Sequence, residues 1–225
     1  MKRFLFLVLL LAQGGWAADW TWEDVGPEGG SMTSISLNPS SSSVLAVSSF
    51  CDGYLAQGGV WQRVLSQWPS GGGGVCSFLL PDTALFILQE NGQLHRSVDG
   101  GLTWSYLRAF PDRVLGLSEV KSNTAYLVAN DMTNFVDTLY RSTDAGANWD
   151  TLCTLPMYFE DDVAITCFLD TLIFIGGWAR DSIWVLKSDD GGLSWNTVVQ
   201  FSSPGDGRVY DLEWDELRKT LWTCF

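Results

Sequence analysis

"SDDGGLSW" occupies residues 188–195, and two related octets lie upstream, "SVDGGLTW" at 97–104 and "STDAGANW" at 142–149. All three read Ser-x-Asp-x-Gly-x-x-Trp and start 45 and 46 residues apart. A fixed period of this size is typical of repeat architectures, in which each repeat is one supersecondary unit. The closing tryptophan extends the series back to Trp61 in "YLAQGGVW", where Tyr54 and Ala56 replace the Ser and the Asp. The sequence therefore predicts four repeats, the first of them degenerate.

The segments between the octets are short and rich in β-branched and aromatic residues, as in "TAYLVAN" (124–130) and "SIWVLKS" (182–188). Gly, Asp, Asn or Ser bounds each one, which is typical of strands. No stretch sustains a helical period over ten residues, so we expect an all-β chain. Four strands per repeat of this length indicate a blade of a β-propeller. The predicted blades cover roughly 26–68, 69–110, 111–156 and 157–202, with a partial fifth blade at 203–225.

The two ends of the chain leave the closure of the ring open. "WTWEDV" (20–25) has the pattern of an outer strand, and we expect it to supply the fourth strand of the last blade. "GRVYDLEWDELRKTLWTCF" (207–225) is interpreted as the first two strands of a fifth blade. Either the chain is the front of a propeller of roughly six to eight blades, which we favour, or it is a five-bladed ring lacking one strand.

The octet has the composition of a turn with its own internal hydrogen bonds. An Asp side chain accepts hydrogen bonds from N–H groups two or three residues later, and a Ser hydroxyl can join the same network. Gly at the fifth position permits a positive φ, and the Trp covers apolar surface at the start of the outer strand. The residues predicted to have this structural role are Ser97, Asp99, Gly101, Trp104, Ser142, Asp144, Gly146, Trp149, Ser188, Asp190, Gly192 and Trp195.

These octets resemble the Asp-box, or BNR repeat, of sialidases, sortilin-type receptors and photosystem II assembly factors. The stretch "DVGPEGGSMTSISLNPSSSSVLAVSS" (24–49) is similar to the first blade of secreted bacterial proteins with such repeats. The resemblance covers residues 20–225. It implies that Asp99, Asp144 and Asp190 lie at the blade periphery between third and fourth strands, away from a central site. It does not imply any one activity.

The first 17 residues have the features of a secretory signal peptide. Lys2 and Arg3 precede an apolar run from Phe4 to Ala12, and small residues lead to a predicted cleavage after Ala17. The run is shorter than the roughly 20 residues that a membrane span needs. We therefore expect a secreted, periplasmic or cell-surface protein with no membrane span after cleavage.

Charge and cysteine content exclude several kinds of ligand. The formal charge of −13 becomes −15 without Lys2 and Arg3, and such a chain repels the phosphates of nucleic acids. The five Cys show no C-x-x-C spacing and there is one His, so we expect no metal site and no cofactor. Cys153 and Cys167 could form a disulfide, although buried free thiols are the favoured interpretation.

The sequence favours binding over catalysis. A sialidase needs an arginine cluster that grips a carboxylate, and the Phe/Tyr-Arg-Ile-Pro signature of that family is absent. Loops at the central face of the propeller should present a binding surface for a protein or carbohydrate, as should "ANDMTNFVD" (129–137) and "GGWARD" (176–181), interpreted as longer hairpin loops. The candidate residues of this face are Trp68, Arg113, Tyr158, Glu160, Asp161, Asp162, Trp178 and Arg208.

The alternative is a sialidase-like glycoside hydrolase with part of its site in a C-terminal portion that this sequence lacks. Paired carboxylates can act as general acid and base at a glycosidic bond. Two acidic groups offer such pairs, namely Glu160, Asp161 and Asp162, and Asp206, Asp211, Glu213 and Asp215. Solvated surface carboxylates are the simpler explanation for both groups. We therefore predict no catalytic residues.

Overall fold

The computed structural model describes residues 32–38, 43–48, 52–57, 60–65, 74–79, 85–89, 92–99, 102–110, 113–118, 123–203 and 207–224. Within these residues every regular element is a strand except one 3₁₀ turn, η1 (Leu169–Thr171). The expected first-blade Trp68, the glycine Gly101 and the segment 20–25 lie outside the described residues. So do the signal-peptide region and Asp206.

The strands form four four-stranded sheets, each antiparallel and ordered as in the sequence. The first sheet contains β1 (Met32–Asn38), β2 (Ser43–Ser48), β3 (Gly53–Gln57) and β4 (Val60–Leu65). The second contains β5 (Gly74–Leu79), β6 (Leu85–Gln89), β7 (Gln93–Ser97) and β8 (Ser105–Ala109). The third contains β9 (Arg113–Leu117), β10 (Ala125–Asp131), β11 (Val136–Ser142) and β12 (Asp150–Thr154).

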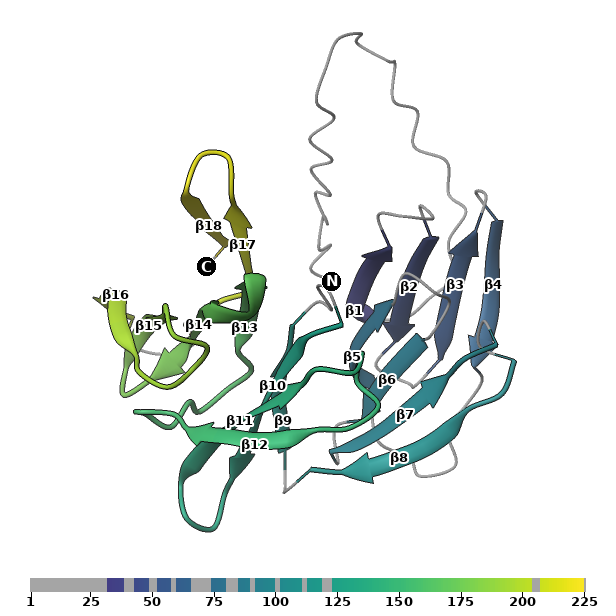
Figure 1. Cartoon of the computed structure of the whole chain (residues 1–225), viewed down its shortest axis with the longest axis horizontal. Coiled ribbons are helices and arrows are strands. Elements are labelled where there is room, and N and C mark those ends of the chain that lie inside the picture. The colour runs from purple at the N-terminus through teal and green to yellow at the C-terminus, as the bar shows by residue number, and fades with distance from the viewer. Residues whose placement is uncertain are drawn as a thin grey trace, which may run out of the picture.

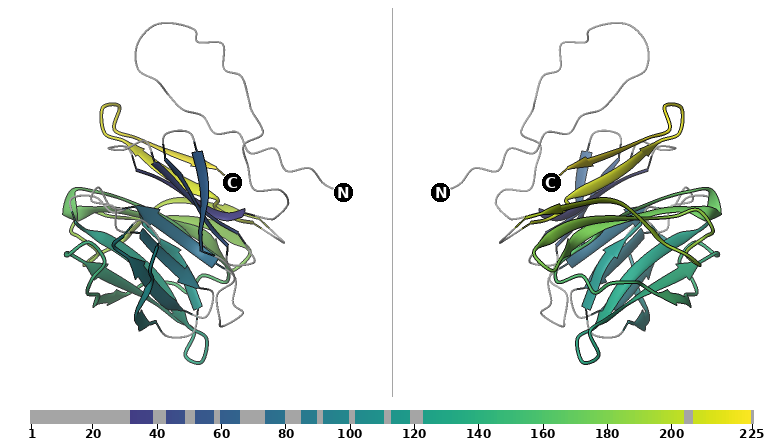
Figure 2. Two further views of the ribbon diagram at one scale, coloured as in Figure 1. Left: turned by 90° about the vertical axis from the view of Figure 1, so that its right-hand side faces the viewer. Right: turned by 90° about the vertical axis from the view of Figure 1, so that its left-hand side faces the viewer.

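The fourth sheet contains β13 (Ala164–Phe168), β14 (Leu172–Ala179), β15 (Ser182–Ser188) and β16 (Asn196–Ser202). A fifth, two-stranded sheet contains β17 (Asp211–Asp215) and β18 (Thr220–Cys224). The five sheets follow one another in an arc in sequence order (Figure 1), and the β17–β18 hairpin projects beyond its neighbours in the side views (Figure 2). The predicted all-β propeller, with four four-stranded blades and a partial fifth, is confirmed.

Burial within a sheet follows the position of the strand. The second strand of the third sheet, β10, is buried at its first six residues, whereas the outer strands β12 and β16 contain only exposed and half-buried residues. Strands near the axis are covered by neighbouring sheets on both faces, so their apolar side chains need not alternate with polar ones. The sheets therefore depend on one another for a core.

The core between the third and fourth sheets is the largest apolar cluster among the described residues. Two glycines allow these sheets to approach closely. A Cβ on Gly116 of β9 would lie 2.4 Å from the carbonyl oxygen of Val163, and one on Gly177 of β14 would lie 2.7 Å from the Phe159 ring. The backbone N–H of Val163 also donates to the carbonyl of Leu115 at 2.9 Å. The inner strands of successive blades are thus in direct contact.

The fold differs from the sequence interpretation at the connection between β14 and β15. "GGWARD" is not a longer loop, because β14 and β15 are joined by a two-residue turn at Arg180 and Asp181, both with positive φ (52° and 56°). Such a turn matches the twist of a hairpin. Cys153 and Cys167 do not form a disulfide, in agreement with the favoured interpretation of these cysteines as thiols. Over the described residues, no helix has the length and apolar character required to cross a membrane.

Candidate functional site

The blades have two chemically different ends. In the third sheet the octet 142–149 follows β11, whereas the loop 131–136 precedes β11 at the opposite end. The segment 155–163, which joins β12 to β13, lies at the same end as that loop, because Leu155 N–H bonds to the carbonyl of Asp137. We call the end with residues 97–104, 142–149 and 188–195 the octet end. The end with residues 131–136 and 155–163 is the loop end.

At the octet end each aspartate is bonded within its own octet. The carboxylate accepts a hydrogen bond from the backbone N–H of the residue four positions later, with N–O distances of 2.8–2.9 Å. Its other oxygen accepts from the side chain of that residue at 2.5–2.6 Å. The acceptors are Asp99, Asp144 and Asp190, and the donors are Thr103, Asn148 and Ser194. These hydrogen bonds hold the pKa of Asp99 and of Asp190 at about 2, below the ordinary 3.8.

The octet serines lie inside the turn and complete its bonding. Each Ser Oγ donates to the Asp Oδ1 at 2.7–2.9 Å. In two octets the same Oγ accepts the N–H of the glycine at 2.8 Å, from Gly146 to Ser142 and from Gly192 to Ser188. These glycines have φ of 77° and 97°, and this conformation reverses the chain. The residue that donates to the Asp carboxylate is therefore four positions later, and not two or three as predicted. The Ser and Asp side chains of these turns are therefore used locally, whereas the Ala145 and Gly191 N–H groups donate to the carbonyls of Asn123 and Thr171.

The octet tryptophans cover apolar surface but do not share one set of bonds. The Trp149 and Trp195 indoles donate to the carbonyl of their own octet glycine at 3.0 and 3.2 Å. The Trp104 indole instead donates to the carbonyl of Val64 on β4, at 3.4 Å, and packs on the cluster of the first sheet. Trp104 thus links the second blade to the degenerate first one.

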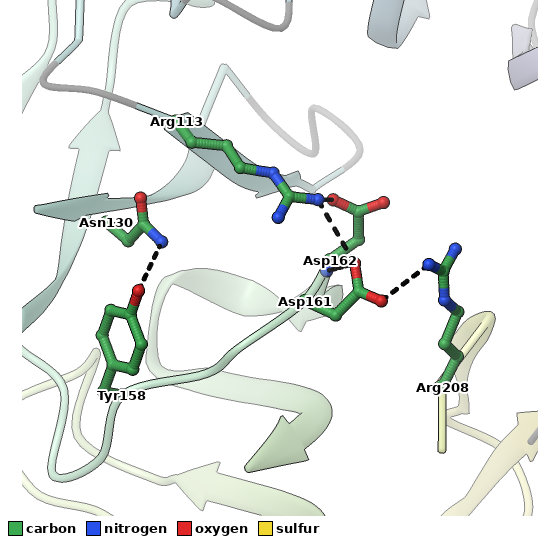
Figure 3. A network of polar contacts seen from close by, with 6 residues as sticks. All are labelled: Arg113, Asn130, Tyr158, Asp161, Asp162 and Arg208. Carbon is green, nitrogen blue, oxygen red and sulfur yellow. Dashed lines mark hydrogen bonds and ion pairs between the residues drawn. The ribbon is translucent and has the colours of Figure 1, made fainter. Parts of the chain in front are cut away.

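Four of the predicted binding-face residues meet at the loop end (Figure 3). Arg113 begins β9, and its Nη2 contacts Asp161 Oδ1 at 3.2 Å and Asp162 Oδ1 at 2.6 Å. Arg208, which precedes β17, contacts Asp161 Oδ2 at 2.7 Å. The Asp162 N–H also donates to Asp161 Oδ1 at 2.9 Å. We call these four residues the ion network, and it connects the third, fourth and fifth sheets.

Burial and charge act against each other in this network. Burial disfavours the charge on Arg113, but Asp162 and Asp161 outweigh it and raise the pKa of the guanidinium. Burial raises the pKa of Asp162 although half of its side chain reaches solvent, and Arg113 opposes that rise. Both oxygens of Asp161 contact a guanidinium. The network is thus a neutralised set of ion pairs and differs from a free arginine cluster.

The other predicted binding-face residues lie apart from the ion network. Glu160 Oε1 accepts the Arg180 N–H at 2.9 Å, and Glu160 N–H donates to the Trp178 carbonyl at 3.0 Å. The Trp178 indole donates to the Ser203 carbonyl at 3.1 Å and packs between the fourth and fifth sheets. Trp178 is therefore an inter-blade packing residue.

An apolar surface lies beside Tyr158 at the loop end. The Phe135 and Tyr158 rings are in edge contact, with centroids 5.4 Å apart. Phe135 is 68% exposed, and Met132 in the same loop is 58% exposed. Asn130 Nδ2 donates to the Tyr158 hydroxyl at 3.4 Å (Figure 3). Exposed large apolar side chains next to charged ones are typical of recognition surfaces.

Sequence reasoning missed three buried residues that support this end. Asn130 and Asp137 are directly opposite one another on β10 and β11, and Arg113 on β9 is opposite Asn130. Asp137 Oδ2 accepts the Phe159 N–H at 2.7 Å, and Phe159 is fully buried. One signal was available in the sequence. Asn130 lies two residues after Val128 and Asp137 lies two residues before Leu139, so each shares a strand face with a core residue. Within the described residues no cluster of three or more His, Cys, Asp or Glu could hold a metal ion.

Comparisons with known proteins place the chain among β-propellers by fold alone. No family model and no curated protein matches the sequence. YCF48 from Cyanidioschyzon merolae is similar in structure, with a TM-score of 0.61 and 15% identity over 90% of this chain. A GH74 enzyme from Niastella koreensis gives a TM-score of 0.56 and 17% identity over 74% of this chain. A chain of the mitotic checkpoint complex gives 0.61 and 13% identity over 99% of this chain and 68% of its own. The chain spans 66% of the YCF48 chain and 24% of the GH74 chain.

Proposed function

We propose that this chain is an exported, non-catalytic β-propeller module of the Asp-box type, and that it binds a protein ligand through its loop end. The observation that carries the proposal is the ion network beside the exposed Met132 and Phe135. An ion network next to exposed apolar side chains suits an interface. Apolar side chains that become buried on binding supply affinity, and the polar rim supplies orientation.

The octets support this division of roles. Their carboxylates are saturated by donors from the same turn, so we propose that they stabilise corners between β7 and β8, β11 and β12, and β15 and β16. A ligand at these carboxylates would have to displace bonds that the fold itself needs. Recognition is therefore assigned to the opposite end of the blades.

Catalysis is disfavoured by the use already made of the acidic groups. A general acid must hold a proton that it can release to the leaving group, but three of the four carboxylate oxygens of Asp161 and Asp162 contact guanidinium nitrogens. The raised pKa of Asp162 is the one observation that favours a glycoside hydrolase as a second candidate. A carbohydrate ligand is also compatible with the Phe135 ring, on which a sugar could stack.

Site-specific photo-cross-linking tests the proposed surface. A benzophenone amino acid replaces Phe135 at the loop end or, as the matched control, Leu193 at the octet end, which is 76% exposed. We expect cross-linked protein adducts from position 135 in the exporting cells and none from position 193. The intact mass of the exported chain should correspond to a start at Ala18.

The outcomes separate the candidates. Adducts from position 193 but none from position 135 would place recognition at the octet end and contradict the proposal. Turnover of any member of a glycan panel, abolished by Asp162→Asn, would replace the binding module with the hydrolase. Glycan binding without turnover, weakened by Phe135→Ser, would identify carbohydrate as the ligand.

A further inference from the structure

Asp137 and Asn130 form a buried polar pair whose hydrogen bonds do not balance if Asp137 is charged. Asp137 is 0% exposed and Asn130 is 3% exposed. Asp137 Oδ1 and Asn130 Oδ1 both lack a hydrogen-bond partner among the described residues. Both unpartnered atoms are acceptors, and buried acceptors without donors are costly. A hydrogen shared by the two oxygens would satisfy both acceptors.

The geometry of the sheet puts the two side chains side by side. Asn130 and Asp137 are register partners on β10 and β11, and opposite residues of an antiparallel pair share one face with Cβ atoms roughly 4.5–5.5 Å apart. A single proton on Asp137 Oδ1 would donate to Asn130 Oδ1 and satisfy both atoms at once. Asp137 Oδ2 would keep the Phe159 N–H.

We propose that the fold holds the Asp137 carboxyl neutral, with its proton donated to Asn130 Oδ1, and that loss of this proton releases the segment 155–163 that covers it. Asp137 touches that segment twice, through its carbonyl to Leu155 N–H and through Oδ2 to Phe159 N–H. A charged carboxylate at this site can reach water only if the segment moves. The second half of the proposal rests on the proposed function, because Tyr158, Asp161 and Asp162 belong to this segment.

No cation compensates a charge at this position. Arg113 is on the neighbouring strand, but its guanidinium contacts Asp161 and Asp162, and no described cation forms an ion pair with Asp137. Burial accordingly raises the pKa of Asp137 to about 7, opposed by the Phe159 N–H. The charged or titratable groups on the elements around it are Arg113 on β9, Tyr126 and Asp131 on β10, Tyr140 and Arg141 on β11, Asp150 and Cys153 on β12, Tyr158, Glu160, Asp161 and Asp162 in the covering segment, and Arg180 and Asp181 after β14.

The substitution Asp137→Asn imitates the neutral acid. Its amide oxygen can accept the Phe159 N–H, and its NH₂ can donate to Asn130 Oδ1 as the proposed carboxylic acid does. We therefore expect the variant to fold and to remove one pH dependence. Asp150→Asn, an exposed change on the same sheet, is the matched control.

The sign of the pH effect is fixed by the direction of the shift. The folded-state pKa of about 7 lies above the ordinary 3.8. The contribution of this proton to stability is therefore complete below about pH 4 and is lost as the pH rises through 7. Between these limits the native state holds one proton more than the unfolded state, and the unfolding constant should rise about tenfold per pH unit relative to Asp137→Asn. A carboxylate that is ionised in the folded state, with its pKa at or below 3.8, would give no relative slope between pH 4 and 7.

Three measurements on the mature chain decide the proposal. The side-chain carboxyl ¹³C signal that Asp137→Asn removes should titrate near pH 7, urea unfolding should show the relative slope above, and the Phe159 amide should lose hydrogen-exchange protection above pH 7 in the wild type only. A carboxyl titrating at or below 4, which would require the Asn130 amide to turn its NH₂ toward Asp137, overturns the proposal. So does an unfolding slope unchanged by Asp137→Asn, or equally changed by Asp150→Asn. Protection of Phe159 that does not depend on pH overturns the release of the segment. No ligand is used, so failure of the cross-linking experiment leaves these outcomes distinguishable.

Discussion

The hydrogen bonds of the octet Ser and Asp side chains differ in range from those of the Asp137 and Arg113 side chains at the loop end. At the octet end the bonding partners of Asp144 and Ser142 are two to four residues away. At the loop end Asp137 bonds to a residue 22 positions away, and Arg113 reaches a partner 49 positions away. The Ser–Asp bonding of the octets therefore forms locally, whereas the ion network forms only when successive blades have docked.

The largest expected effect is a loss of stability at the loop end. Phe159→Ala empties a fully buried position between the third and fourth sheets, next to Gly177. Removing a buried Phe costs about 3–5 kcal/mol through lost burial and the cavity that remains, and we expect that loss in the free energy of urea unfolding. Phe201→Ala on β16, where the ring is 41% exposed, is the control and should cost much less. Equal losses would mean that Phe159 does not anchor the segment.

A smaller effect is expected at the octet end. Ser142→Ala removes the buried acceptor of the Gly146 N–H and a donor to the exposed Asp144. An unpaired buried N–H costs about 1–3 kcal/mol, and calorimetry should show the loss as a lower Tm. Ser105→Ala, on the exposed face of β8, should change stability by no more than about 0.5 kcal/mol. If the two changes were equivalent, the octet would not be a cooperative turn.

The smallest expected effect is a loss of stability of the octet turns at low pH. The pKa of Asp99 and of Asp190 is about 2, lowered mainly by the side-chain hydroxyls of Thr103 and Ser194. Their contribution to stability is present above the ordinary pKa of 3.8 and is lost as the pH falls toward 2. Hydrogen exchange corrected for its intrinsic pH dependence should show Thr103 and Ser194 amides losing protection below pH 4. Retained protection at pH 2 would show that the carboxylates do not hold these turns.

The two ends should therefore respond to pH in opposite directions. The octet carboxylates are stabilised as anions by local donors, whereas burial without a cation stabilises Asp137 as a neutral acid. The aspartates at the two ends thus differ in pKa, because the octets supply N–H and O–H donors and the loop end supplies an apolar interface.

How far the sequence could predict each part depends on the same distinction. Repeated octets and short β-rich segments predicted the all-β propeller with four-stranded blades, because strand periodicity and turn residues act over a few positions. The sequence assigned Arg113, Asp161 and Arg208 to one face but did not predict their ion pairs, since spacing along the chain does not determine which side chains meet. The turn at Arg180 was misjudged as a loop because hairpin geometry depends on the register of β14 and β15.

The sequence by itself determined the repeat, the strand content and the kind of turn that follows each third strand, because those depend on local conformational preference and local hydrogen bonds. Tertiary structure alone decided that Asn130 and Asp137 are buried together beneath Phe159, and that three sheets share one ion network. Burial and long-range pairing exist only after blades pack, and packing controls both the charge of Asp137 and the surface offered at the loop end.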